Sequence, residues 1–304
     1  MLDSQFIRNN LDAVIANCRN RNVTADPAAV LALDDERKRL VQESQLLQQR
    51  ANEIAKSIPQ EKEPARKQAL IAEGKSLRDR VSAFQAELQE VESRLHAALL
   101  TIPNMTHPDA PIGRDPSDNR VIRTWGERPA FSFPPKDHVA LVESLRLADF
   151  EAGASVAGQK FYFLLNEAAL LEVALVQYAL RKLVDEGYTP VITPDLARAE
   201  VLEGIGFLPR DPNPETRQVY AVADTDLCLI ATAEITLGGM HRNQIFDELD
   251  LPKRYVGLSH CFRTEAGAPG RDTRGLYRVH QFTKVEMFAF CTPDQSESLH
   301  QELL

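Results

Sequence analysis

The sequence lacks the motifs that mark the common nucleotide and metal sites. Its 304 residues contain no GxGxxG, no P-loop, no HExxH and no internal repeat, so a nucleotide site of the Rossmann or Walker kind is excluded. There are only four cysteines, Cys18, Cys228, Cys261 and Cys291, and none has CxxC or metal-ligand spacing. We interpret them as free thiols in a reducing compartment and expect no metal site within the given chain.

The sequence also lacks a targeting or membrane signal. Its start, MLDSQFIRNN, has neither the basic head and apolar stretch of a secretory signal nor the composition of a transit peptide, and no apolar run is long enough to span a membrane. We therefore expect a cytoplasmic protein without a membrane partner. The formal net charge is −9, so binding to nucleic acid would depend on local basic clusters and not on the overall field.

The first third of the chain does contain a long heptad pattern. The apolar series downstream of Pro64 are Leu70, Leu77, Phe84, Val91 and Ala98, and Val81, Leu88, Leu95 and Ile102, and the series upstream of Pro59 is Leu33, Leu40, Leu47 and Ile54. Two amphipathic helices joined by the break SIPQEKEP must run antiparallel. The pattern therefore predicts a coiled-coil hairpin over about residues 34–102, within an N-terminal region 1–103. Its second helix is expected to be on the order of 50 Å long.

The surface of this hairpin carries many basic side chains, among them Lys56, Lys62, Arg66 and Lys67, and acidic residues roughly balance them. Balanced charge is usual on a solvated helix face, and heptads often serve as spacers or oligomerisation elements. The arm taken alone therefore leaves an RNA-binding role and a purely structural role both open.

A region of different character follows the arm. Residues 104–135 are rich in proline, aspartate and glycine and are predicted to link the arm to a domain over residues 136–304. In that domain LLNEAALLEVALVQYALRKLVDEGYTPVITP predicts a helix ending at Gly187 and a strand that reaches Pro194. The helix is apolar on more than one side, so we expect its own sheet and a second subunit to bury it. Strands without regular βα alternation predict an α+β fold with a mainly antiparallel sheet flanked by helices.

The densest group of functional residue types lies in CFRTEAGAPGRDTRGLYRVHQFTKVEMF, residues 261–288. Period-two alternation predicts strands over YVGLSHCFRTE and over residues 276–290, with an extended glycine-rich loop between them. If the polar faces of the strands coincide, one cleft wall carries the side chains of Arg263, Glu265, Arg278, Phe282 and Glu286. A guanidinium suits a phosphate or carboxylate, a phenyl face suits a heteroaromatic base, and a carboxylate accepts from an exocyclic amine. The pattern favours a nucleotide-phosphate site, with a solvated face of cross-strand ion pairs as the alternative.

These residues resemble a known family. The hairpin FRTEAGAPGRDTRGLYRVHQFTKVE is similar to motif 2 of class II aminoacyl-tRNA synthetases, in the version typical of seryl-tRNA synthetases, and GYTPVITP resembles their dimer-forming motif 1. TAE at residues 232–234 resembles the serine-binding loop, and MLDSQFIRNN, the heptad hairpin, LLTIPN and ADFEAGASVAGQKFYFL match in order and spacing over the whole chain. The resemblance implies a homodimeric serine–tRNA ligase. Such an enzyme forms seryl-adenylate from serine and ATP and transfers the seryl group to tRNA(Ser), and to tRNA(Sec) where that is present.

The resemblance also implies roles for single residues. Arg263 is implied to be catalytic, because it would hold the α-phosphate of ATP and the serine carboxylate and stabilise the charge of the transition state. The implied ATP-binding residues are Arg263, Thr264, Glu265, Val279 and Phe282, with Glu265 accepting from the adenine amino group and Phe282 stacking on the ring. The implied serine-binding residues are Thr232, Ala233, Glu234, Arg263 and Glu286. The implied tRNA-binding residues are Arg271 and Arg274 in the motif 2 loop and Lys56, Lys62, Arg66 and Lys67 on the arm, which would lie along the long variable arm of the tRNA.

Two features depart from the family pattern. The chain ends at SESLHQELL, just after motif 2, whereas the family continues with a segment that supplies a magnesium-binding glutamate and with motif 3. We therefore expect the chain to be a fragment of a full synthetase that is inactive alone, and we expect the Mg²⁺ ligand in the part not given. The serine-binding loop, IATAEITLGGM, also differs from the usual pattern in lacking a proline before TAE.

Two other classes of protein stay open as alternatives. A truncated, non-catalytic tRNA-binding paralogue would be expected to lose Arg263, Glu265 or Glu286 while keeping the arm, and this chain has all three residues. A plain coiled-coil interaction protein would leave the polar face of the hairpin unexplained.

Overall fold

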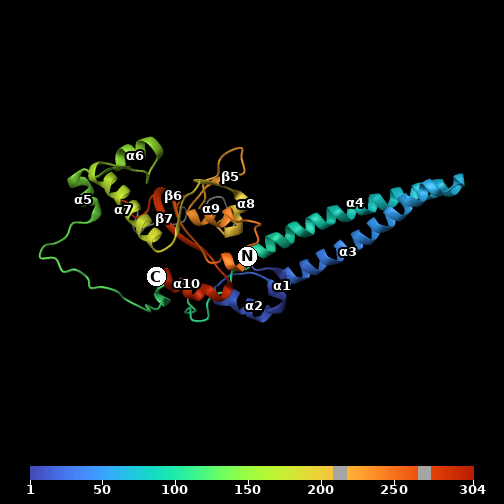
Figure 1. Ribbon diagram of the computed structural model, residues 1–304, viewed down its shortest axis with the longest axis horizontal. Helices are drawn as coiled ribbons and strands as arrows, with labels where there is room; N and C mark the ends of the chain where they lie inside the picture. The colour runs from blue at the N-terminus through green and yellow to red at the C-terminus, as the bar shows by residue number, and fades with distance from the viewer. Residues whose placement is uncertain (208–217, 266–274) are drawn as a thin grey trace. The chain divides into compact units, whose positions relative to one another are not determined.

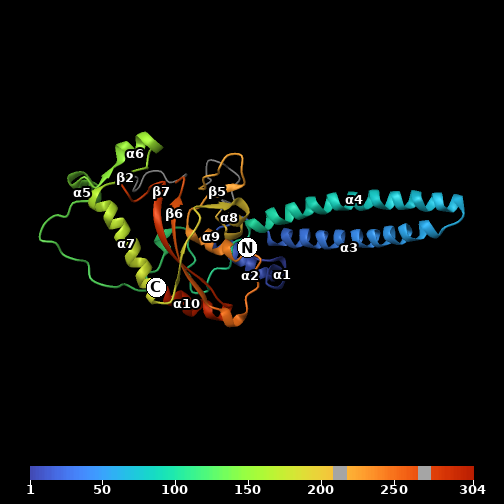
Figure 2. The ribbon, with the colours of Figure 1, turned by 45° about the horizontal axis from the view of Figure 1, so that its top comes forward.

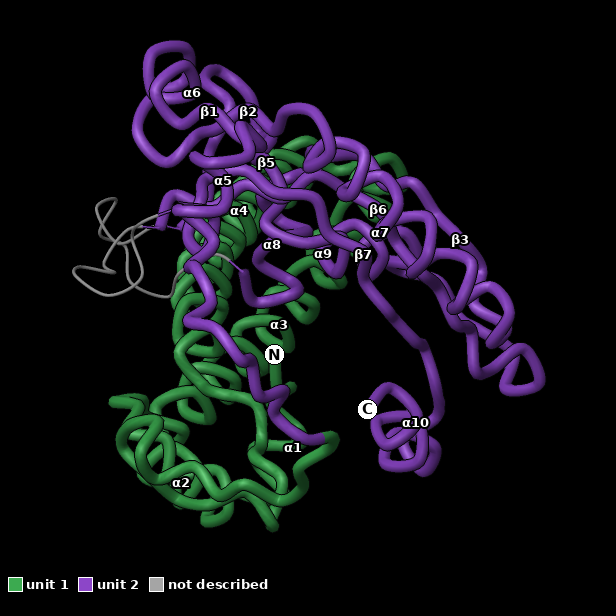
Figure 3. The backbone as a smooth tube through the Cα atoms, turned by 90° about the vertical axis from the view of Figure 1, so that its left-hand side faces the viewer, with its two compact units in different colours: residues 1–126 green, residues 127–304 purple. Residues whose placement is uncertain are grey.

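The computed structural model describes residues 1–207, 218–265 and 275–304. The chain divides into two compact units, Met1–Gly126 and Glu127–Leu304, which are coloured separately in Figure 3. Each unit has a hydrophobic core of its own. None of the helices in the described ranges is both long and apolar enough to cross a membrane.

The first unit is helical, and two long antiparallel helices dominate it (Figure 1). Its elements are α1 (Ser4–Asn9), α2 (Leu11–Asn20), α3 (Pro27–Ser57), η1 (Ile58–Gln60), α4 (Pro64–Thr101) and η2 (Pro116–Asp118). Pro27 and Pro64 stand in the first turns of the long helices, where their missing amide hydrogens are not needed. The coiled-coil hairpin predicted from the heptads is confirmed.

The seam of the hairpin packs the heptad positions. Ala51 and Ile54 of α3 form a buried cluster with Leu77 of α4, and Leu47 and Leu70 pack against it. Near the base of the hairpin, Leu95 and Ile102 join residues of α1 and α2 in a second cluster. The long helices are therefore held by the predicted apolar contacts and are attached at one end to the small helices.

A buried carboxylate ties α1 to the base of α3. Asp34 is 2% exposed, and its oxygens accept from Arg8 of α1 at 3.0 Å, from Arg37 at 3.2 Å and from Lys38 at 2.6 Å. Burial by itself would raise the pKa of Asp34, but the hydrogen bonds from Lys38, Arg8 and Arg37 outweigh it and hold that pKa below its usual value. A buried charge of this kind is tolerated only with such partners.

The second unit is an α+β fold around a three-stranded sheet. Its elements are α5 (His138–Leu145), β1 (Ala148–Asp149), α6 (Phe150–Ala157), β2 (Phe163–Leu164), α7 (Asn166–Asp185), β3 (Thr189–Ile192), β4 (Leu196–Arg198), α8 (Ala199–Ile205), β5 (Leu227–Leu229), α9 (Ala233–Met240), η3 (Glu248–Asp250), β6 (Lys253–Phe262), β7 (Gln281–Phe290), η4 (Pro293–Gln295) and α10 (Ser296–Glu302). The sheet order is β3-β6-β7, and β6 pairs antiparallel with β7. The sheet is mainly antiparallel as predicted, but β3 runs parallel to β6.

The hairpin β6–β7 lies between two helices. Helix α7 contacts β6 and β7 on one side, and α9 contacts both strands on the other, as Figure 2 shows. Gly257 of β6 permits the approach of α9, because a Cβ there would lie 2.9 Å from Leu237 Cδ1 and 3.0 Å from Ala233 Cβ. The start of α9 is thereby held directly against the face of the sheet that carries Glu286, the partner of Gly257 across the strands.

The predicted second strand begins later than expected. Period-two alternation predicted a strand from Leu276, but β7 begins at Gln281. The ladder ends because its partner strand ends at Phe262, and Glu265 then takes a left-handed φ of 51°. Residues 276–280 instead make turns and bends, and their amides find partners elsewhere: the N–H of Leu276 binds His138, and that of His280 binds the carbonyl of Lys160.

Helix α7 ends as predicted, with Gly187 just beyond it at a φ of 86°. One side of the helix contacts the sheet, but none of its residues is buried within the chain. Leu170, Val173 and Tyr178 are 73%, 67% and 67% exposed, and Leu171 and Leu175 are exposed as well. An apolar side of this length facing solvent is unusual and is typical of an interaction surface.

Candidate active site

A polar cluster stands where the start of α9 meets β7. Thr232, the N-cap of α9, is 1% exposed. Its hydroxyl donates to Glu286 Oε2 at 2.6 Å and accepts from Lys284 Nζ at 3.0 Å, and the backbone N–H of Glu234 donates to the same oxygen at 3.3 Å. Lys284 also forms an ion pair with Glu286. Three of the residues predicted to bind serine, Thr232, Glu234 and Glu286, are thus brought together.

The cluster is electrostatically unusual because it holds two carboxylates close together. Burial raises the pKa of Glu234, the neighbouring charge of Glu286 raises it further, and Lys284 opposes the shift. Lys284 is therefore the cation that balances the pair. Lys284 shares one face of β7 with Phe282 and Glu286, but no role was predicted for it from the sequence. The available signal was its position between Phe282 and Glu286 on that face.

Arg263 lies beside this cluster, one residue beyond the end of β6. Its backbone N–H donates to the carbonyl of His280 at 2.9 Å, which fixes where the side chain starts. The guanidinium reaches the carbonyl of Ala231 at 3.4 Å and stands over the ring of Phe282 at 5.1 Å. Within the described residues Arg263 makes no ion pair. Its charge is therefore available to an anion held between the threonine cluster and the phenyl ring.

The remaining predicted ATP residues continue from Arg263. Glu265 Oε2 accepts from Arg278 Nη1 at 3.1 Å, so this half-buried carboxylate is held by an ion pair across the hairpin end. The backbone N–H of Thr264 donates to the carbonyl of Gln218 at 3.4 Å, and Val279 is buried. The alternative of cross-strand ion pairs describes Arg278–Glu265, but Lys284–Glu286 lies within β7, and neither pair accounts for Arg263.

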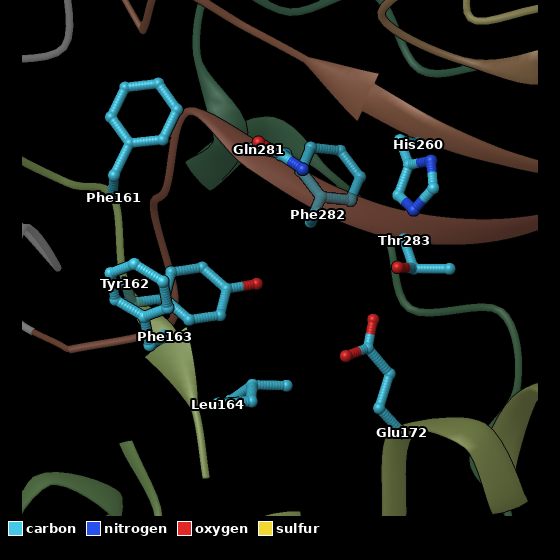
Figure 4. A pocket seen from close by; sticks show the side chains of 9 residues that line it. All are labelled: Phe161, Tyr162, Phe163, Leu164, Glu172, His260, Gln281, Phe282 and Thr283. Carbon is cyan, nitrogen blue, oxygen red and sulfur yellow. The ribbon is translucent and has the colours of Figure 1, made fainter. Parts of the chain in front are cut away.

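A cavity of about 240 Å³ lies at the other face of the hairpin. Figure 4 shows its lining side chains, which come from the segment around β2, from α7 and from the strand ends: Phe161, Tyr162, Phe163, Leu164, Glu172, His260, Gln281, Phe282 and Thr283. Of the residues predicted to bind ATP or serine, it includes only Phe282. Burial raises the pKa of Tyr162 in this cavity, and the charge of Glu172 adds to the effect.

The residues predicted to bind tRNA are in part outside the described ranges. Arg271 and Arg274 lie in residues 266–274, which the structure does not describe. The four on the arm lie at its tip: Lys56 in the last turn of α3, Lys62 between the helices, and Arg66 and Lys67 in the first turn of α4. All four are exposed. Arg66 also pairs with Glu61 at 3.5 Å. Exposed basic groups at the end of a long hairpin are accessible to a large anionic partner.

Comparison with known proteins defines the class. Residues 220–304 match the class II tRNA synthetase core domain described for glycine, histidine, proline, serine and threonine enzymes, and residues 1–106 match the seryl-tRNA synthetase N-terminal domain. The solved seryl-tRNA synthetase of Pyrococcus horikoshii, in complex with ATP, superposes with a TM-score of 0.82 at 37% identity, over 100% of this chain and 72% of that one. The second unit thus has the fold of a class II aminoacyl-tRNA synthetase core.

The particular family follows from close relatives. The chain is 54% identical over its full length to the serine–tRNA ligase of Rubrobacter xylanophilus and 49% identical to that of Treponema denticola, and it covers 71% of each. The cytoplasmic serine–tRNA ligase of Naegleria fowleri, solved with AMP, superposes with a TM-score of 0.74 at 26% identity, over 99% of this chain and 69% of that one. The chain belongs to the seryl-tRNA synthetase family.

Proposed function

We propose that the described site activates serine with ATP and that the seryl group then passes to tRNA(Ser), and to tRNA(Sec) where it is present. One observation carries this proposal: Arg263 stands between the Thr232–Lys284–Glu286 cluster and the ring of Phe282. An amino acid held by the cluster and a nucleotide held on the ring would meet at the guanidinium.

In the first reaction the serine carboxylate attacks the α-phosphorus of ATP. The new bond joins a carboxylate oxygen to phosphorus, the bond to the β-phosphate oxygen breaks, and pyrophosphate leaves. Arg263 stabilises the negative charge that develops on the α-phosphate oxygens and holds the attacking carboxylate near them. In the second reaction a terminal ribose hydroxyl of the tRNA attacks the carbonyl carbon of seryl-adenylate, AMP leaves, and the hydroxyl proton is released.

Recognition of the two small substrates falls to opposite ends of the site. Phe282 stacks on adenine, Glu265 accepts from its exocyclic amine, and Arg278 holds that carboxylate in place. At the other end, Glu234 and Glu286 bind the serine ammonium and hydroxyl groups together with Thr232. Because a carboxylate must be ionised to bind an ammonium strongly, Lys284 contributes by keeping the carboxylate pair charged.

The arm is proposed to bind tRNA. The exposed tip residues Lys56, Lys62, Arg66 and Lys67 supply local positive charge, which supports contacts to the backbone and shape of an RNA. Arg271 and Arg274 are proposed to approach the acceptor end. The homodimer is proposed to form through the exposed apolar side of α7.

Two further proposals concern the surroundings of the enzyme. The described residues contain no disulfide, which supports a reducing compartment such as the cytoplasm. Class II chemistry uses Mg²⁺ with ATP, but the described residues contain no group of three or more histidine, cysteine, aspartate or glutamate side chains able to hold a metal. The residues present therefore do not fit a metal site by themselves, and no step above depends on one.

Serine-dependent exchange of labelled pyrophosphate into ATP tests the first reaction, and charging of tRNA(Ser) tests the second, both with the full-length protein. We expect exchange with serine and none with alanine or without an amino acid. Binding of tRNA(Ser) without serine-dependent exchange would instead identify the protein as the non-catalytic paralogue.

A further inference from the structure

A histidine far from the site in sequence contacts the end of the hairpin connection. His138 begins α5, and its Nε2 accepts from the backbone N–H of Leu276 at 3.2 Å. The imidazole also packs edge-on against the ring of Tyr277, with ring centroids 4.3 Å apart. An Nε2 that accepts carries no hydrogen, so this contact requires the ring hydrogen to be on Nδ1.

The backbone at this contact is built to let the histidine approach. Gly275 has a φ of 75°, and a Cβ at that position would lie 2.1 Å from His138 Nε2 and 2.8 Å from Val139 Cγ2. Any side chain other than glycine would displace the imidazole, and the left-handed φ would also be strained. The approach of His138 to Leu276 therefore requires a glycine with this backbone conformation at position 275.

We propose that His138 is a positioning residue for ATP, acting through Arg278 on Glu265. The contact fixes Leu276 and Tyr277, and the next residue is Arg278, whose Nη1 donates to Glu265 Oε2 at 3.1 Å. This stretch lies outside the β-ladder, since β7 begins only at Gln281, so the sheet does not fix it. The imidazole fixes the stretch on the N-terminal side of Arg278, and His280 fixes it on the other side through Arg263 and Lys160.

This inference rests on the proposed function, because Glu265 is the residue proposed to bind adenine. It assigns no chemical step to His138, and it predicts that a change at His138 affects ATP binding but not serine binding. Loss of the acceptor loosens Arg278 and hence Glu265, so ATP binding weakens. The serine cluster of Thr232, Lys284 and Glu286 lies on other elements and keeps its geometry, so serine binding does not change.

Two matched variants separate the acceptor from the ring. His138→Phe keeps an aromatic ring against Tyr277 but removes the acceptor. His138→Gln removes the ring but can place a carbonyl oxygen the same number of bonds from Cγ as Nε2. In the full-length protein we expect His138→Phe to raise the KM for ATP about fivefold to tenfold, the usual effect of one lost half-buried hydrogen bond, and His138→Gln to restore most of it. The KM for serine should stay unchanged in both.

Two additional measurements guard against simple misfolding. A melting curve is recorded for each variant, and ATP binding is measured directly by calorimetry. Gly275→Ala should reproduce the ATP defect, and His138→Gln should not rescue it, because the strain at Gly275 stays. His138→Phe combined with Glu265→Gln should cost little more than Glu265→Gln alone, since both act on one contact.

The results that would reject the role of His138 differ from those that would reject the proposed function. An unchanged ATP affinity in His138→Phe, or equal rises in the KM values of ATP and serine, would overturn the positioning role. A wild-type protein that binds ATP without serine-dependent exchange would reject the proposed function, and the calorimetric affinities of the variants would still decide the role of His138.

Discussion

The charged side chains of this site differ in whether they have an ion-pair partner within the protein. Lys284, Glu286 and Arg278 already have partners, but Arg263 makes no ion pair within the described residues and rests only on a carbonyl and a ring. Paired groups set geometry, whereas a preorganised cation without a counter-ion is suited to bind an anion. This difference separates the residues that shape the site from the one proposed to act on the reacting phosphate.

The Arg263→Lys variant tests this distinction. Lysine keeps the charge but loses the planar fork that spans two oxygens. Losing a preorganised donor of this type costs about 10²–10³ in rate, or roughly 3–4 kcal/mol. Serine-dependent pyrophosphate exchange by the full-length protein should fall by that factor, while the melting temperature stays nearly constant. A near-wild-type exchange rate, or a melting temperature lowered enough to account for the lost activity, would indicate that Arg263 has only a structural role in the hairpin.

Lys284→Met should damage serine binding in a pH-dependent way. Lys284 opposes the raised pKa of Glu234, so its loss raises that pKa further. Serine binding needs ionised Glu234, and therefore the KM for serine should rise as the pH falls, with the rise beginning at a higher pH than in the wild type. Loss of a hydrogen bond from a charged group predicts an increase of about tenfold or more. Lys284→Arg should restore much of the affinity, and Thr283→Ser, on the opposite strand face, serves as the control. A serine KM with the wild-type pH profile would refute the role of Lys284.

At the scale of elements, the site depends on how closely α9 approaches the sheet. Gly257→Ala adds a Cβ that meets Leu237 and Ala233, and the Cβ of Ala233 cannot rotate away. Overpacking of this kind costs about 1–3 kcal/mol, so the melting temperature should fall. Because α9 starts at Thr232, its shift should also raise the KM for serine and leave that for ATP unchanged. Gly204→Ala in α8 meets nothing within 4 Å and should be neutral or slightly stabilising. Equal melting temperatures and equal KM values for serine in the two alanine variants would contradict the packing argument.

Elements with strong periodicity were predictable from sequence, and elements that depend on distant contacts were not. The heptads predicted α3 and α4, and the apolar helix before Gly187 predicted α7, because each pattern repeats over many residues. The start of β7 was predicted wrongly because alternation continues through residues 276–280, whereas their amides bind Lys160 and His138. His138 itself has no local signal, since its partner lies 138 residues further along the chain. Strand alternation does place Lys284 on the polar face of β7. Its role, however, requires the buried hydroxyl of Thr232, whose position cannot be predicted from alternation along the strand.

At the scale of the whole molecule, the exposed apolar side of α7 predicts a dimer. Leu175 is 59% exposed, and its neighbours on α7 are similarly open to solvent. Leu175→Asp places a charge in the proposed interface, and burial of an unpaired carboxylate is costly, so light scattering should show a shift from dimer to monomer at micromolar concentration. Ile245→Asp changes a residue that is 99% exposed in the segment after α9 and should leave the dimer intact. A wild-type protein that is monomeric under these conditions would contradict the prediction.

The arm and the catalytic unit should be separable in function. The two units have separate cores, and the cluster of Ala51, Ile54 and Leu77 packs within the hairpin. The base must be kept, however, because Leu95 and Ile102 pack against α1 and α2 and Arg8 binds Asp34. We therefore predict that replacing residues 44–84 with a short glycine–serine turn in the full-length protein leaves serine-dependent pyrophosphate exchange near the wild-type rate. Charging of tRNA(Ser) should fall far more than exchange, since the deletion removes the basic tip and most of the length proposed to contact the RNA. If exchange is lost together with charging while the melting curve is unchanged, the arm supports adenylate formation directly, and its role as an independent tRNA-binding element is wrong.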